Sequence, residues 1–218
     1  LRPLGMIGYL FTAALLADAW FYNLDHFLFI VIGIVGAAGT VWIFTRDSDG
    51  CVPGMSVTIF GGLWMGLAMA TGILITKMPD GRYILGILMA VVCLTDVGAY
   101  IVGCNLGRRK LCPRLSPHKT IEGAIGGFLF AIIAAVLCHM ILKAVYRPVF
   151  PFMTMILIGG VFGILGQMGD LIESALKRDA GIKDSGRAIA GHGGVLDLMD
   201  SLIFCIPLMY VWLKVFHA

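Results

Sequence analysis

The sequence predicts an all-α fold, a polytopic bundle of about seven transmembrane helices in one membrane-embedded domain over 1–218. Of the 218 residues, 59% are hydrophobic and only 13% are charged, whereas an ordinary soluble domain has about 25% charged residues. A soluble fold of this length cannot bury so much apolar surface, because much of its own surface must still face water. The hydrophobic residues also gather in long runs, as they do in helices that cross a membrane.

Seven apolar runs are long enough to span the membrane, since about 20 helical residues cross roughly 30 Å of hydrocarbon. They lie near 4–22, 26–44, 57–75, 83–104, 123–142, 150–173 and 201–217. The connections are short except at 105–122 and 174–200, where the charge is concentrated. We therefore expect the functional site in two segments, 96–127 and 169–201. Asp18 and Asp25, near the ends of the first two spans, are expected to be solvated.

The distribution of Lys and Arg predicts the orientation of the spans. With the spans alternating in direction, eleven of these residues fall on the N-terminal side and five on the other. The richer side is normally cytoplasmic, so both long connections are expected to face the cytoplasm, in a bacterial inner membrane. The net charge of +3 is not gathered into a tail or a basic helix, so no nucleic-acid partner is expected.

The segment 169–201 is the strongest candidate site. If the sixth helix continues beyond the membrane, its polar residues share one face at i, i+3, i+4 and i+7: Asp170, Glu173, Ser174 and Lys177. Acidic side chains in a membrane segment are costly and usually face a polar cavity or a partner. Asp170 is therefore a site candidate, and a pair with Lys177 or Arg178 at the helix end is the alternative.

A polar, glycine-rich stretch follows that helix. Its residues are Lys183, Asp184, Ser185, Gly186, Arg187, His192, Gly193 and Gly194. Glycines let a backbone approach a ligand closely, and successive N–H groups can bind an anion. Nearby cations would neutralise phosphates, although a solvated turn is the alternative. His192 has no second ligand at metal-binding spacing, so we expect it to face a phosphate or to position one.

Carboxylates also begin the last span, where Asp197, Asp200 and Ser201 share one helix face. Acidic helix ends thus flank the glycine-rich stretch on both sides. Oxygen ligands of this kind suit Mg²⁺, which takes one or two carboxylates together with substrate phosphates. Mg²⁺ is therefore the expected cation, and a second cation is left open.

The segment 96–127 holds a second group of polar residues. Asp96 lies inside the fourth span, and the connection beyond it carries five cations: Arg108, Arg109, Lys110, Arg114 and Lys119. Lys119 and Thr120 come just before a predicted helix N-terminus, which favours a phosphate. Arg108 to Lys110 have an alternative role, because a basic cluster at a membrane surface attracts anionic headgroups without catalysis.

Three stretches carry a resemblance to a known family: S-A-L-K-R-D-A-G-I-K-D-S-G over 174–186, H-G-G-V-L-D over 192–197 and S-P-H-K-T-I-E-G over 116–123. They resemble the phosphatidate cytidylyltransferase (CDP-diacylglycerol synthase) family. The resemblance implies a multi-span enzyme that transfers the cytidylyl group of CTP to phosphatidic acid and releases pyrophosphate, with a divalent cation. It also implies further N-terminal spans beyond those of this chain.

The resemblance assigns the metal to Asp170 and Asp197. The expected catalytic residues are Asp170, Lys177, Arg178, Lys183, Asp184 and Asp197. The expected substrate-binding residues are Lys119, Thr120, Ser174, His192, Gly193, Gly194 and Asp200. One position departs from the family pattern, which has arginine directly after Asp197 where this sequence has Leu198. Leucine cannot make the bidentate phosphate contact that a guanidinium makes.

Other functions remain open at this point. A CTP-dependent kinase of a polyprenol or phytol would release CDP, and a CDP-archaeol synthase would differ in its lipid tails. A transporter or an inactive lipid-binding paralogue is favoured by Asp96 and by Leu198. The expected partners are CTP, phosphatidic acid and membrane lipids; the sequence does not decide whether the chain forms a homodimer.

Overall fold

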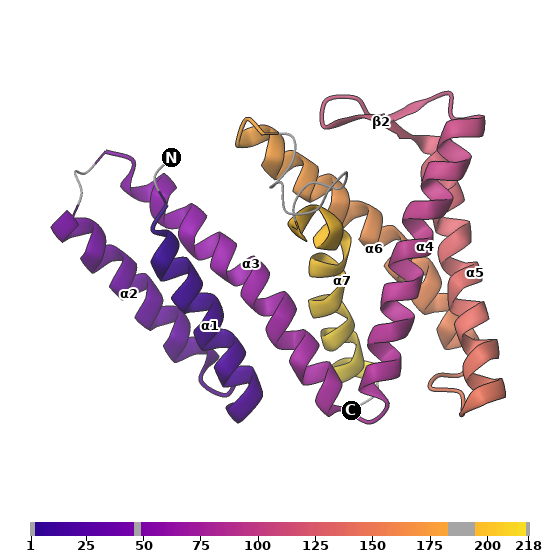
Figure 1. Cartoon of the computed structure of the whole chain (residues 1–218), viewed down its shortest axis with the longest axis horizontal. Coiled ribbons are helices and arrows are strands. Elements are labelled where there is room, and N and C mark those ends of the chain that lie inside the picture. The colour runs from indigo at the N-terminus through magenta and orange to yellow at the C-terminus, as the bar shows by residue number, and fades with distance from the viewer. Residues whose placement is uncertain (1–2, 46–48, 183–194, 217–218) are drawn as a thin grey trace. The chain divides into compact units, whose positions relative to one another are not determined.

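A computed structural model of the chain describes residues 3–45, 49–182 and 195–216, with the side chains of the last range from 199 onward. Seven helices in these ranges are long and apolar enough to cross a membrane, so the predicted all-α transmembrane bundle is confirmed. They are α1 (Gly5–Tyr22), α2 (Phe27–Thr45), α3 (Cys51–Lys77), α4 (Gly81–Leu106), α5 (Ile121–Val145), α6 (Phe152–Asp179) and α7 (Val195–Phe216). Figure 1 shows their course.

The helices extend beyond the apolar runs that predicted them. α4 continues to Leu106, and α6 continues to Asp179. The 26 residues of α4 and 28 residues of α6 are more than the roughly 20 that cross the hydrocarbon. Both helices are therefore long enough to extend beyond the apolar layer, and the expected continuation of the sixth helix is confirmed.

A short hairpin replaces the loop expected over 105–122. Strands β1 (Lys110–Cys112) and β2 (Ser116–Thr120) pair antiparallel, with Lys110 opposite Thr120 and Cys112 opposite Ser116. Figure 1 shows the hairpin at the shared end of α4 and α5. A strand of three residues is too short for alternation of apolar and polar side chains to predict it.

The chain divides into two compact units, one of Leu1–Pro79 with Met209–Ala218 and one of Asp80–Leu208. The prediction of a single membrane-embedded domain stays a prediction. Both segments in which the site was expected, 96–127 and 169–201, belong to the second unit.

The first unit contains a buried carboxylate that the sequence did not explain. Asp18 is only 4% exposed, so the expectation of a solvated Asp18 is wrong. Its carboxylate accepts a hydrogen bond from the backbone N–H of His26 at 3.1 Å and lies 2.9 Å from His26 Nδ1. Lys77 donates to the carbonyls of Ala19 (2.8 Å) and Trp20 (2.6 Å) at the end of α1. These polar groups fix the turn between α1 and α2.

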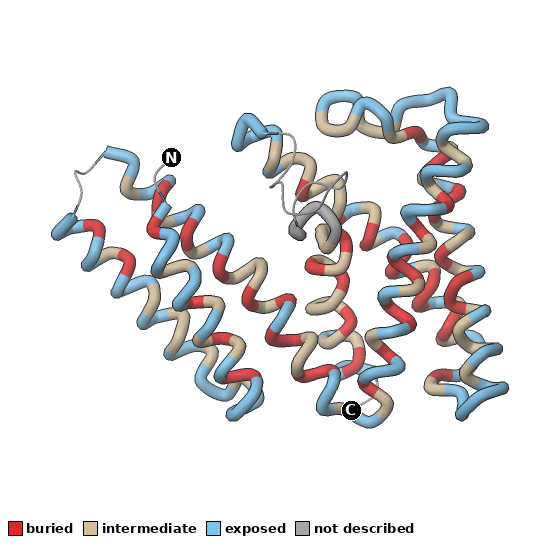
Figure 2. The backbone as a smooth tube through the Cα atoms, viewed as in Figure 1, coloured by how far each residue is buried: buried red, intermediate tan, exposed pale blue. Residues whose placement is uncertain are grey.

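Glycines set the close helix contacts of the second unit. A Cβ at Gly123 of α5 would lie 2.8 Å from the carbonyl oxygen of Ala99 in α4. A Cβ at Gly169 of α6 would lie 2.9 Å from Cβ of Phe204 in α7. Neither distance leaves room for a side chain, so these helices approach to backbone contact, as small residues allow in membranes. Figure 2 shows the buried faces where they meet.

Candidate active site

The hairpin is held against the first turn of α5 by capping hydrogen bonds. Thr120 is the N-cap of α5, and its Oγ1 accepts from the backbone N–H of Gly123 at 3.1 Å. The carboxylate of Glu122 accepts from the backbone N–H groups of Arg108 at 3.0 Å and Arg109 at 3.1 Å. Thr120 satisfies an otherwise unpaired N–H of the helix, while Glu122 ties the entry of the hairpin to its exit. The backbone beside Lys119 is thereby fixed.

A cavity of about 580 Å³ lies between α4, α5, α6 and the hairpin. Its polar lining includes Asp96, Lys110, His118, Lys119, Gln167 and Asp170. Gln167 supports the wall by donating to the carbonyl oxygens of Ala124 at 3.2 Å and Gly163 at 3.1 Å. A cavity of this size, with a few convergent polar groups, is the usual form of a small-molecule site.

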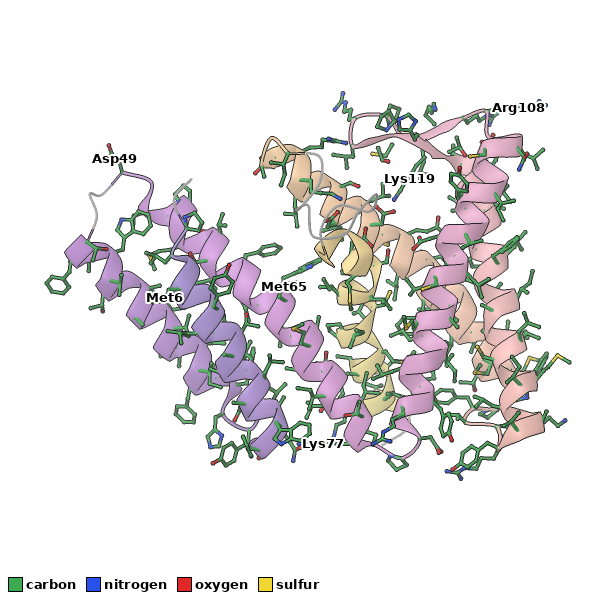
Figure 3. All side chains as sticks on the ribbon, viewed as in Figure 1. Met6, Asp49, Met65, Lys77, Arg108 and Lys119 are labelled. Atoms are coloured by element: carbon green, nitrogen blue, oxygen red, sulfur yellow. The ribbon has the colours of Figure 1, made fainter. Side chains whose placement is uncertain are left out.

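Charged groups of α4, α6 and the hairpin line this cavity, and Asp200 of α7 acts electrostatically on two of them. Lys119 of β2 forms an ion pair with Asp170 of α6. The charge of Asp170 also acts on Asp96 of α4 and Asp200 of α7, and the ammonium of Lys119 acts on the same two carboxyl groups. Figure 3 shows Lys119 on the side of the hairpin that faces α6. The fold thus brings Asp96 and Asp170, one from each predicted segment, to the same cavity as Lys119.

The other predicted residues of α6 have protein partners. Lys177 forms an ion pair with Glu173, which is 3% exposed. Arg178 Nε donates to the carbonyl oxygen of Leu115 at 3.4 Å, and Ser174 Oγ donates to Asp170 Oδ1 at 3.4 Å. The residues at i, i+3, i+4 and i+7 therefore do share a face. Phosphate binding by Lys177 and Arg178 stays a prediction.

Several predicted residues lie outside the part of the chain that the structure describes. They are Lys183, Asp184, His192, Gly193 and Gly194. Asp197 and Leu198 belong to the first turn of α7, but their side chains are not among those described. The proximity of Asp170 to Asp197 is therefore untested, whereas Asp200, one turn further along α7, interacts with Asp170.

Comparison with known proteins identifies the family. The chain matches the Cytidylyltransferase family over residues 2–216. It belongs to that family. It is also similar to the protein named phosphatidate cytidylyltransferase from Bacillus subtilis (strain 168), with 44% identity over 126 residues, which cover 58% of this chain and 45% of that protein.

Staphylococcal proteins of the same name give a similar result. The protein of Staphylococcus epidermidis (strain ATCC 12228 / FDA PCI 1200) is 44% identical over 138 residues, 63% of this chain and 51% of that protein. The protein of Staphylococcus aureus (strain COL) is 43% identical over 140 residues, again 63% of this chain and 51% of that protein. The chain spans about half the length of the curated relatives it matches.

The carboxylates at this site are oxygen ligands, which suit a hard divalent cation such as Mg²⁺. Among the described residues, no group of three His, Cys, Asp or Glu side chains is arranged to hold a metal alone. Mg²⁺ does not require such a group, because it binds one or two carboxylates and completes its shell with water and phosphate oxygens. Asp170 and Asp200 are carboxylates of this kind, and the charge of Asp170 acts on Asp200.

Asp96 is a cavity residue that the sequence interpretation left out of the expected catalytic and substrate-binding residues. It lines the cavity and interacts with both Asp170 and Asp200. The available signal was an acidic residue inside an apolar span, which usually marks a polar cavity or a partner. The sequence left its partners open because they come from helices far away in the chain.

Proposed function

We propose that this chain transfers the cytidylyl group of CTP to phosphatidic acid, giving CDP-diacylglycerol and pyrophosphate in phospholipid biosynthesis. Membership of the Cytidylyltransferase family and the names of its relatives support this reaction. The observation that carries it is the meeting of Lys119 with Asp96 of α4 and Asp170 of α6 at one cavity, within the electrostatic reach of Asp200 of α7. A nucleoside triphosphate needs positive groups for its phosphates, and its cation needs carboxylates. The membrane-spanning helices place both kinds of group where a lipid substrate can reach them.

The reaction needs no strong general base. A phosphate monoester has a second pKa near 6, so the lipid phosphate is already largely ionised at pH 7. One of its oxygens attacks the α-phosphorus of CTP and forms the new P–O bond. The bond from that phosphorus to the oxygen bridging to the β-phosphorus breaks, and pyrophosphate leaves with the electron pair. Catalysis then rests on placing the reactants in line and stabilising the charge.

The residues of this chain divide that work between cations and carboxylates. Lys119, beside the N-terminus of α5, would bind a phosphate group of the nucleotide. Lys177, Arg178 and Lys183 would contact the remaining phosphates, as the sequence predicts. Mg²⁺, held by Asp170 and Asp200 and by Asp197 from the sequence prediction, would neutralise charge on the phosphates.

We further propose that this site faces the cytoplasm of a bacterial cell from the inner membrane. The uneven distribution of Lys and Arg over the two sides supports that orientation, and CTP is made on that side. The hairpin contributes most to the asymmetry, because residues 107–120 contain five Lys and Arg and no Asp or Glu.

Radioactive CTP labelled at either the α- or the γ-phosphorus tests the proposal. The purified chain, in detergent with phosphatidic acid and Mg²⁺, should move the α-label into the lipid and release the γ-label as pyrophosphate. A lipid kinase would move the γ-label, and a transporter or binding protein would move neither. Substituting Asp170→Asn should stop the transfer, whereas Asp179→Asn, on an exposed residue of the same helix, should not. Transfer of the γ-label, or full activity of Asp170→Asn, would refute the proposal.

A further inference from the structure

We propose that Lys119 is an internal counter-ion that competes with the divalent cation for Asp170 and releases it when a nucleotide phosphate takes the ammonium group. The inference rests on the proposed function to the extent that Asp170 is taken as a cation ligand. It adds a dependence of cation binding on phosphate that the reaction itself does not require.

The ion pair is placed so that its partners can exchange. Lys119 and Asp170 are each 27% exposed and both line the cavity, so a ligand in the cavity can reach either group. The backbone of Lys119 is fixed by the hairpin and by the Thr120 cap. The long side chain is therefore the part that moves, and the ammonium can turn from Asp170 to a phosphate without any change in the fold.

The local charge explains why the divalent cation and the nucleotide phosphate should bind together. The ammonium of Lys119 pairs with Asp170 and acts electrostatically on Asp96 and Asp200. These carboxylates attract a divalent cation. However, a cation that binds Asp170 displaces the ammonium and leaves two positive groups close together. A phosphate relieves this repulsion, because it gives Lys119 a new anionic partner.

Removing the ammonium should therefore strengthen the binding of a cation in the absence of nucleotide. The substitution Lys119→Met keeps the length and removes the charge. Lys110→Met is the matched control, because Lys110 is a lysine that lines the same cavity and has no ion pair to a carboxylate among the described residues. Lys119→Arg keeps the charge and should behave like the parent chain.

The experiment measures binding of Mn²⁺ alone to the full chain in detergent by electron paramagnetic resonance, at about 0.15 M salt to screen distant charges. Lys119→Met should bind Mn²⁺ roughly tenfold more tightly than the parent, as expected for loss of a competing, partly buried ion pair. Lys110→Met should change the affinity by less than about threefold, because its charge acts only through screened solvent. The double variant Lys119→Met/Asp170→Asn should lose the gain.

Two results would overturn the inference. One is a gain in Lys119→Met no larger than that in Lys110→Met. The other is a gain that survives in the double variant, which would place the cation away from Asp170. If Lys119→Met does not give a monodisperse protein, Lys119→Gln tests the same charge. Because Mn²⁺ is measured without CTP or lipid, failure here is distinct from failure of cytidylyl transfer, which the labelled CTP detects.

Discussion

The substitution Gly169→Ala tests whether close contact between α6 and α7 holds the acidic groups together. Gly169 directly precedes Asp170, and a Cβ at this position would lie 2.9 Å from Cβ of Phe204, 3.2 Å from Cα of Ser201 and 3.4 Å from the carbonyl oxygen of Asp200. Two of these atoms belong to the backbone of α7 and the third is fixed close to it. The methyl group therefore cannot be accommodated by a side-chain rotation, and α7 must move away.

The size of the effect follows from these distances. Ordinary contact of a Cβ begins at 3.4 Å, so the 2.9 Å contact requires a shift of 3.4 − 2.9 = 0.5 Å. Overpacking of this kind costs about 1–3 kcal/mol, and the better helix propensity of alanine offsets about 1 kcal/mol. The net loss of unfolding free energy is then about 0–2 kcal/mol. Activity is more sensitive, because a displacement of about 1 Å can cost about 100-fold; half that displacement should cost roughly tenfold.

Gly160→Ala is the matched control, since it makes the same change on the same helix. Its Cβ would meet Phe128 Cε2 at 3.6 Å, an ordinary contact. Thermal unfolding in detergent and transfer of α-labelled CTP should be measured for both variants. Gly160→Ala should keep its activity and unfold at the parental temperature or slightly above it. The reasoning is refuted if Gly169→Ala keeps full activity, or if both variants lose activity equally.

Three further predictions concern the hairpin, the departure from the family pattern and the turn of the first unit. Glu122→Ala should lower transfer roughly tenfold by freeing the hairpin. Glu122→Gln should keep most activity, because its amide oxygen still accepts hydrogen bonds. Equal losses of activity in the two variants would argue against a hairpin held by Glu122. Leu198→Arg should raise transfer and lower the KM for CTP by adding a charge-assisted phosphate contact, and unchanged kinetics would show that arginine is not needed here. Asp18→Ala should lower the unfolding free energy by about 2 kcal/mol, because hydrogen bonds to a buried carboxylate are lost. Asp25→Asn is the control on an exposed residue. Equal melting temperatures of Asp18→Ala and Asp25→Asn would contradict the prediction.

The sequence predicted the helices because membrane thickness sets their length and hydropathy marks their position. It also placed a helix start after Thr120, where the structure has the N-cap. The hairpin was missed because its strands are too short to show a pattern. Asp18 was misjudged because its partner, His26, lies beyond a turn that sequence reasoning did not resolve.

The candidate site was predicted in part. Asp170 and Lys119 were both singled out, but nothing in the sequence pairs a residue of a hairpin with one of a later helix. Lys177 has a partner that its spacing already allowed. Its spacing of four residues from Glu173 was visible, and the structure pairs the two, although the sequence interpretation assigned Lys177 to a phosphate. Local spacing predicts neighbours on one helix, whereas tertiary contacts depend on how the helices pack.

Binding of Mn²⁺ to Asp170→Asn and to Asp200→Asn most directly tests whether carboxylates of α6 and α7 serve one cation. Both variants should lose Mn²⁺ binding, while Asp179→Asn should bind it as the parent chain does. Parental affinity in either Asp170→Asn or Asp200→Asn, with the variant folded, would contradict a shared cation site.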